Sequence, residues 1–129
     1  MKTIRFTSYV VALLVLGGCG QTTAPSATNV VGACAGCHTF GEGGPMLSGP
    51  NLYGIVGEKA GMRSGFAYSS AMRDSGVVWT AEALDAFLQA PAKFMPGNRM
   101  AFSGEVDAAR RASIIEHMQA PARTPDQQN

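Results

Sequence analysis

The sequence predicts an all-α domain of three to four short helices joined by glycine-rich loops. Two segments in its second half repeat apolar residues at helical spacing, and the two-residue alternation of a β-strand is nearly absent. Between residues 41 and 65 the chain is interrupted by many glycines, and so long a loop indicates either function or a large group to wrap around. The 129 residues suffice for one such domain with a thin core.

The first 28 residues indicate an export signal and a tether. Lys2 and Arg5 precede the apolar run 6–16, which is too short for a membrane span and typical of a secretory signal peptide, here residues 1–18. The Leu-Gly-Gly before Cys19 resembles a bacterial lipobox, whose cysteine is lipidated, and an ordinary signal peptide cut nearby is the alternative. Residues 19–28 are therefore interpreted as the polar, lipid-anchored tether of a periplasmic lipoprotein in a Gram-negative bacterium.

The charge of the mature chain argues against nucleic-acid binding. Of the ten lysines and arginines, Lys2 and Arg5 lie in the signal peptide, which leaves eight basic side chains against nine acidic ones. A protein that binds nucleic acid needs a basic stripe to neutralise phosphates, and a formal charge of −1 without such a stripe excludes this class.

The predicted domain covers residues 29–120, followed by a polar tail at residues 121–129. Asn29 is suited to cap a short first helix that runs through Val30 and Val31 into the sequence CAGCH. The glycine-rich stretch follows this helix and precedes the two longer helices.

The two longer helices are predicted from their caps and apolar faces. Thr80 is the expected N-cap of a helix that stops before Pro91. The last helix begins near Asp107 and stops before Pro121. The buried faces of the two helices are predicted to be Leu84, Phe87 and Leu88, and Arg111, Ile114, Ile115 and Met118.

Cys34, Cys37 and His38 lie within five consecutive positions. Two thiols at this spacing can add to the two vinyl groups of a haem while the adjacent imidazole reaches its iron. A disulfide leaves the histidine unexplained, and a thioredoxin-like pair would need a strand–helix–strand setting. Zinc would need a fourth nitrogen or sulfur ligand, and beyond Cys19 the mature chain offers only His117. One covalently attached haem c is therefore the predicted cofactor.

One imidazole leaves the other side of the iron open, and six methionines remain in the mature chain. Met100 is the preferred second ligand, because the Pro-Gly pair at 96–97 turns the chain and leaves it on a short, stiff loop. Met95 is the second choice and His117 the third. A thioether opposite an imidazole raises the reduction potential, which favours electron transfer over oxygen binding.

With these residues, the chain resembles a class I cytochrome c of the mitochondrial and alphaproteobacterial type over residues 29–119. The matching motifs are CAGCH at 34–38, GPNLYGIVG at 49–57, GFAYS at 65–69, Trp79, and PGNRMAF at 96–102. The resemblance implies the small class I cytochrome c fold wrapped around one haem. It also implies thioether bonds from Cys34 and Cys37, with His38 and Met100 as axial ligands.

The resemblance also implies residues that support the haem. The carbonyl of Pro50 would accept the second ring N–H of His38, which fixes the imidazole and makes it a better donor to iron. Tyr68 and Trp79 match positions that hydrogen-bond a buried propionate, a role compatible with ordinary aromatic core. The residues expected to pack on the ring or, in the last case, beside its exposed edge are Leu52, Leu88 and Phe102.

Three positions depart from the pattern of the family. Phe87 stands where a tyrosine hydroxyl commonly contacts the methionine sulfur, Met72 replaces a common asparagine, and Glu58 replaces an arginine near a propionate. Met72 indicates a drier distal side, and the lost hydroxyl and the added carboxylate predict a reduction potential below that of a typical mitochondrial relative. His117 is expected to be a packing or surface residue.

The predicted function is electron transfer, not enzymatic catalysis, by a monomeric carrier between quinol–cytochrome c reductase and a terminal oxidase or photosynthetic reaction centre. Two alternatives are a peroxidase or gas-binding protein with an open iron, and a fixed haem subunit of a larger redox complex. A positive rim for docking and scattered solvated charges are equally compatible with four side chains, which are Arg63, Arg73, Lys93 and Arg99.

Overall fold

The computed structural model describes residues 30–119. The predicted signal peptide, Cys19, the tether, Asn29 and the tail at 121–129 lie outside the described residues. Four helices lie wholly within the described residues, namely α2 (Ser70–Arg73), α3 (Ala81–Gln89), α4 (Pro91–Phe94) and α5 (Ala108–His117). The only β-type pairing within residues 30–119 is an isolated antiparallel bridge between Lys59 and Val78, so the all-α prediction is confirmed. None of the described helices has the length and apolar character needed to cross a bilayer.

The two longer helices begin where their caps were predicted. The Thr80 hydroxyl accepts a hydrogen bond from the backbone N–H of Ala83 at 3.1 Å, and Asp107 accepts one from Arg110 at 2.8 Å. Such caps satisfy backbone donors that the first turn of a helix leaves unpaired. The residues that α3 and α5 bury are those of the predicted faces, which are Leu84, Phe87, Leu88, Arg111, Ile114 and Ile115.

The short helices differ from the sequence-based expectation. Pro91 does end α3, but it also begins α4, where its missing N–H would have been unpaired in any case. The expected first helix lies largely outside the described residues; Val30 is helical, and residues 32–37 follow as hydrogen-bonded turns, with the N–H of Ala35 donating to the carbonyl of Val31 at 2.9 Å. Neither α2 nor α4 was predicted, because a single turn offers no repeating apolar pattern.

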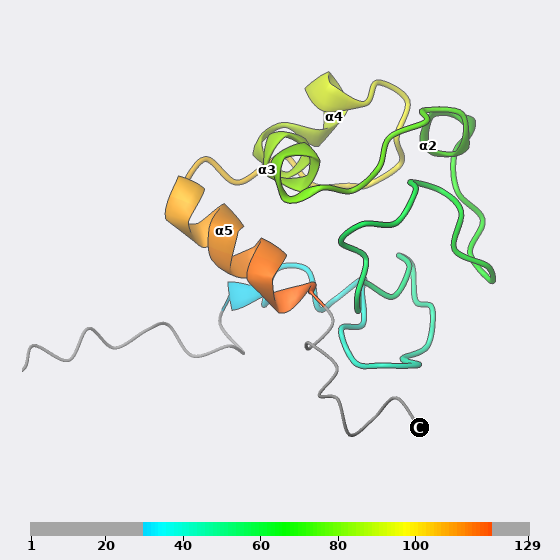
Figure 1. Cartoon of the computed structure of the whole chain (residues 1–129), viewed down its shortest axis with the longest axis horizontal. Helices are drawn as coiled ribbons and strands as arrows, with labels where there is room; N and C mark the ends of the chain where they lie inside the picture. Colours follow the sequence, from blue (N-terminus) through cyan, green and yellow to red (C-terminus); the bar gives the residue numbers. More distant parts are fainter. Residues whose placement is uncertain (1–29, 120–129) are drawn as a thin grey trace, which may run out of the picture.

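Helices α3, α4 and α5 pack together on one side of the molecule, and the loop between residues 39 and 68 lies on the other (Figure 1). The rings of Trp79 and Phe87 lie 5.0 Å apart, and that of Phe94 lies 5.9 Å from Phe87. A carboxylate oxygen of Asp85 on α3 lies 2.7 Å from Nε of the buried Arg111 on α5. Aromatic packing and this ion pair hold the helices beside one face of a cavity.

Candidate functional site

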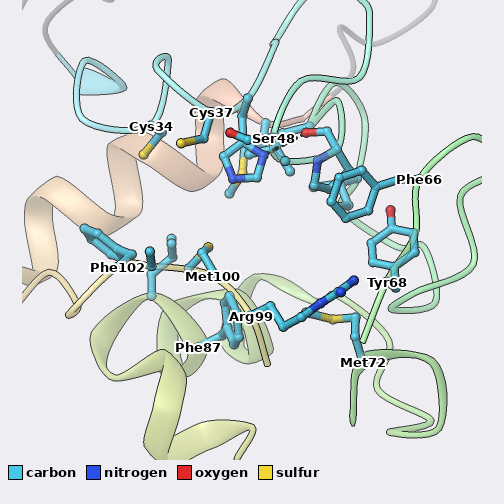
Figure 2. Close-up of a pocket in the computed structure, with 18 of the residues that line it drawn as sticks. Cys34, Cys37, Ser48, Phe66, Tyr68, Met72, Phe87, Arg99, Met100 and Phe102 are labelled. Carbon is cyan, nitrogen blue, oxygen red and sulfur yellow. Dashed lines mark hydrogen bonds between the residues drawn. The ribbon is translucent and has the colours of Figure 1, made fainter. Parts of the chain in front are cut away.

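A cavity of about 550 Å³ separates the loop from the helices. Its volume is in the range of cofactor sites, and its lining is mainly apolar. In Figure 2, Cys34 and Cys37 lie on one side of the cavity with their sulfur atoms directed inward, and Met100 and Phe102 lie across from them. Every residue predicted to bind or support a haem lines this cavity, namely Cys34, Cys37, His38, Pro50, Leu52, Tyr68, Trp79, Leu88, Met100 and Phe102.

The imidazole of His38 is held by two backbone features. Its Nδ1 lies 2.7 Å from the carbonyl oxygen of Pro50, as the resemblance implied. Since a carbonyl can only accept, Nδ1 carries the proton and Nε2 keeps the lone pair that a metal needs. A Cβ on Gly49 would lie 2.3 Å from Cε1 of His38, so only glycine leaves room for the ring in this orientation.

The two cysteines lie in the turns that lead into His38. The backbone N–H of Cys37 and that of His38 both donate to the carbonyl of Cys34, at 3.0 and 2.9 Å. Burial, and next the neighbouring Cys37, raise the pKa of the Cys34 thiol, while the charge of Arg110 opposes the shift. A raised pKa disfavours the thiolate that zinc requires. Residues 30–119 contain no group of three His, Cys, Asp or Glu side chains placed to hold a metal ion.

The loop that carries Met100 is braced by a residue that sequence reasoning missed. The amide of Asn98 donates to the carbonyls of Pro91 and Met95 at 2.9 and 2.8 Å, and its oxygen accepts from the N–H of Met100 at 3.0 Å. An asparagine directly after the Pro-Gly pair was the available signal. Asn98 thus ties the position of Met100 to α4.

The two other candidate ligands lie elsewhere. Met95 is 5% exposed, belongs to the core and does not line the cavity. The ring of His117 packs against that of Phe40 at 5.3 Å, which is one of the two roles, packing or surface, expected of it. Met100 is therefore the candidate that the cavity supports.

Comparisons with known proteins agree with this geometry, although no protein-family model matches the chain. The cytochrome c of Trypanosoma brucei brucei is 50% identical over 78 residues, which cover 60% of this chain and 84% of that protein. A cytochrome c homolog of Bradyrhizobium diazoefficiens is 43% identical over 93 residues. These residues cover 71% of this chain and 50% of the Bradyrhizobium protein. The solved structure of cytochrome cH from Methylobacterium extorquens is 34% identical in sequence and superposes with a TM-score of 0.67. The match covers 71% of this chain and 92% of the cytochrome cH chain.

The chain belongs to the class I cytochrome c family. It is accordingly an electron-transfer protein with one covalently attached haem c. The cavity fits this cofactor, because two thiols, a correctly protonated imidazole and a thioether converge on one apolar space.

Two of the three departures from the cytochrome c pattern lie at the cavity, and the third does not. Phe87 and Met72 both line it. The carboxylate that Glu58 introduces in place of a cation does not stand alone, because Glu58 lies outside the lining and its Oε1 lies 2.7 Å from Nη2 of Arg63. The argument for a lowered potential therefore depends on Phe87, while Met72 indicates a drier distal side.

The four basic residues considered for docking occupy different environments. Arg99 lines the cavity and donates to the carbonyl of Ala67, while Arg73 is exposed and donates to the carbonyl of Tyr68. Lys93 is exposed on α4. Most donors of Arg63 are engaged within the chain, which makes it a poor docking residue.

Proposed function

We propose that this cytochrome c is a membrane-tethered, monohaem electron carrier. In this proposal Cys34 and Cys37 form the thioether bonds, while His38 and Met100 are the axial ligands. The observation that carries the haem assignment is the cavity that His38 lines, with both thiols on one side and Met100 across from them. The support residues are those that line the same cavity, namely Pro50, Leu52, Tyr68, Trp79, Leu88 and Phe102.

When bound, the haem supplies an iron that cycles between the ferric and ferrous states. The chain contributes a fixed imidazole through the His38–Pro50 hydrogen bond, which strengthens the ligand. Cys37 is exposed and Phe102 is half-buried, so this edge of the cavity is the side that a redox partner can approach. The rest of the lining keeps water from the cofactor.

We also propose how the carrier operates in the cell. Lipidation of Cys19 would hold it at the periplasmic face of a membrane, where a monomer could move between quinol–cytochrome c reductase and a terminal oxidase or photosynthetic reaction centre. Lys93, Arg73 and Arg99 remain candidates for the positive rim that a partner recognises. If these charges guide docking, the transfer rate should fall as added salt screens them.

Mass analysis and fractionation of the protein matured in a periplasm test this proposal. The wild type should carry one haem adduct and fractionate with membranes, whereas Cys19→Ser should keep the adduct and become soluble. Replacing Cys34 and Cys37 by serine should abolish the adduct without changing the fractionation. Bare thiols in the wild type would contradict the cofactor assignment, and an unchanged fractionation of Cys19→Ser would contradict the tether.

Purification and kinetics separate the carrier from the two alternatives. A mobile carrier purifies alone and is reduced by quinol–cytochrome c reductase at a rate that depends on its concentration. Co-purification in fixed stoichiometry with other redox proteins would instead identify a subunit. Rapid binding of carbon monoxide by the reduced protein would indicate an open iron.

A further inference from the structure

Arg63 makes a set of hydrogen bonds that the docking hypothesis does not explain. Its Nη2 and Nε donate to the two carboxylate oxygens of Glu58 at 2.7 and 3.1 Å. The same guanidinium donates to the backbone carbonyls of Asn51 and Tyr53 at 2.8 and 2.9 Å. Only 19% of the Arg63 side chain is exposed. A fork geometry with nearly all donors engaged is typical of a structural arginine.

The bonds of Arg63 extend to the segment that orients His38. Asn51 is buried, and its amide donates to the Thr39 hydroxyl and the Gly41 carbonyl at 2.7 and 2.9 Å. The residue before Asn51 is Pro50, whose carbonyl lies 2.7 Å from Nδ1 of His38. Arg63 therefore joins three separate parts of the loop, residues 39–41, 51–53 and 58, next to the imidazole.

The charges of Arg63 and Glu58 also reach the end of the cavity that Tyr68 lines. Burial raises the pKa of the Tyr68 phenol above its usual 10.0, and of the two charges Arg63 acts to lower that pKa while Glu58 acts to raise it. The two charges thus oppose each other at the cavity wall. If one of the two charges were removed, the other would act on Tyr68 unopposed.

We propose that Glu58 and Arg63 form a charge-compensated clamp, which holds the loop in place beside His38 and keeps two opposed charges at the Tyr68 end of the cavity. The proposal rests on the haem assignment made above. Reduction adds an electron to the cofactor, so a nearby cation favours the reduced state and a nearby carboxylate favours the oxidised state. Each partner of the clamp therefore opposes the shift in reduction potential that the other would cause.

Five variants of the haem-loaded protein test the clamp. Glu58→Gln should raise the reduction potential and lower the pKa of Tyr68, and Arg63→Met should shift both quantities in the opposite directions. The double variant should return both quantities close to those of the wild type while lowering resistance to denaturant. Arg63→Lys keeps the charge and should keep the potential even though it loses the fork. Lys59→Met removes a neighbouring exposed charge and is the matched control.

The measurements are a redox titration and an NMR titration of the tyrosine rings, with the sulfur-to-iron near-infrared band recorded for each variant. Loss of that band in the wild type would contradict the ligand assignment and not the clamp. Shifts of the same sign in Glu58→Gln and Arg63→Met would overturn charge compensation and indicate a purely structural role. Shifts no larger than those of Lys59→Met would overturn it as well. If Arg63→Met fails to mature, Arg63→Lys and Glu58→Gln still decide the outcome.

Discussion

The two sides of the cavity are built on different physical principles. The loop wall, residues 31–69, buries only Val31, Ile55 and Ala60 among its apolar side chains. It is held instead by hydrogen bonds, above all those of Asn51 and Arg63. The helix wall, residues 79–118, buries the aromatic and aliphatic faces of α3 and α5.

This difference separates two tasks that one small domain has to perform. Apolar packing is nondirectional and supplies stability, whereas hydrogen bonds are directional and fix an orientation. Changes in the loop wall should therefore affect the cofactor more than stability, and changes in the helix wall should do the reverse. Gly49→Ala and Ile115→Ala test this division, while Asn98→Ala and Glu82→Gln test the loop that carries Met100 and the cap of α3.

Gly49→Ala should have the largest effect on the loop wall. The added Cβ would lie 2.3 Å from Cε1 of His38, which forces the ring away from the carbonyl of Pro50. We expect a severe loss of correctly ligated haem, measured by absorption spectroscopy of the purified protein. Gly36→Ala is the matched control, because a Cβ on Gly36 meets nothing within 4 Å. A normal spectrum for Gly49→Ala would refute the proposed role of this glycine.

Sequence reasoning could predict the helix wall better than the loop wall. Thr80 and Asp107 are local caps, and the spacing of the apolar residues after each cap predicts which face of the helix is buried. The Arg63 side chain bonds Asn51 and Glu58 across a loop of irregular backbone. Such loops have no fixed residue spacing from which these contacts could be predicted. The site residues were nevertheless predicted, because the CAGCH motif and the family pattern encode them without any need for backbone geometry.

Ile115→Ala should have the largest effect on the helix wall. Ile115 is 6% exposed and does not line the cavity. Its truncation should lower the free energy of unfolding by ~2–4 kcal/mol through lost burial and a new void. Chemical denaturation followed by α-helical circular dichroism measures the loss. The reduction potential should stay that of the wild type. A shift in potential as large as that of Glu58→Gln would contradict the proposed division of tasks between the two walls.

Asn98→Ala should loosen Met100 with a smaller cost in stability. The loss of the bonds to Pro91 and Met95 should lower the free energy of unfolding by ~1–2 kcal/mol. Added imidazole should then displace the thioether at a lower concentration than in the wild type, which a titration followed by the sulfur-to-iron band measures. Asn98→Asp keeps the acceptor for the N–H of Met100 and should be intermediate. Equal imidazole sensitivity of all three proteins would contradict the bracing role.

Glu82→Gln should have the smallest effect, and only above a certain pH. A backbone hydrogen bond, followed by one to the Thr80 side chain, holds the pKa of the Glu82 carboxyl below its usual 4.5. A carboxyl with a lowered pKa in the folded state stabilises the protein above about pH 4.5, and this contribution disappears as the pH falls through the folded value. The melting temperatures of wild type and variant should therefore differ slightly at pH 7 and converge toward pH 3. A difference in melting temperature that stays constant or grows on acidification would be inconsistent with the lowered pKa of Glu82.

The most direct test of the account is the near-infrared spectrum of the oxidised protein, which reports whether a thioether sulfur binds the iron. The wild type and Met95→Ala should both show the sulfur-to-iron charge-transfer band, because Met95 lies in the core and does not line the cavity. Met100→Ala should lose the band. Absence of the band from the wild type, or its persistence in Met100→Ala, would contradict a haem held between the two walls by His38 and Met100.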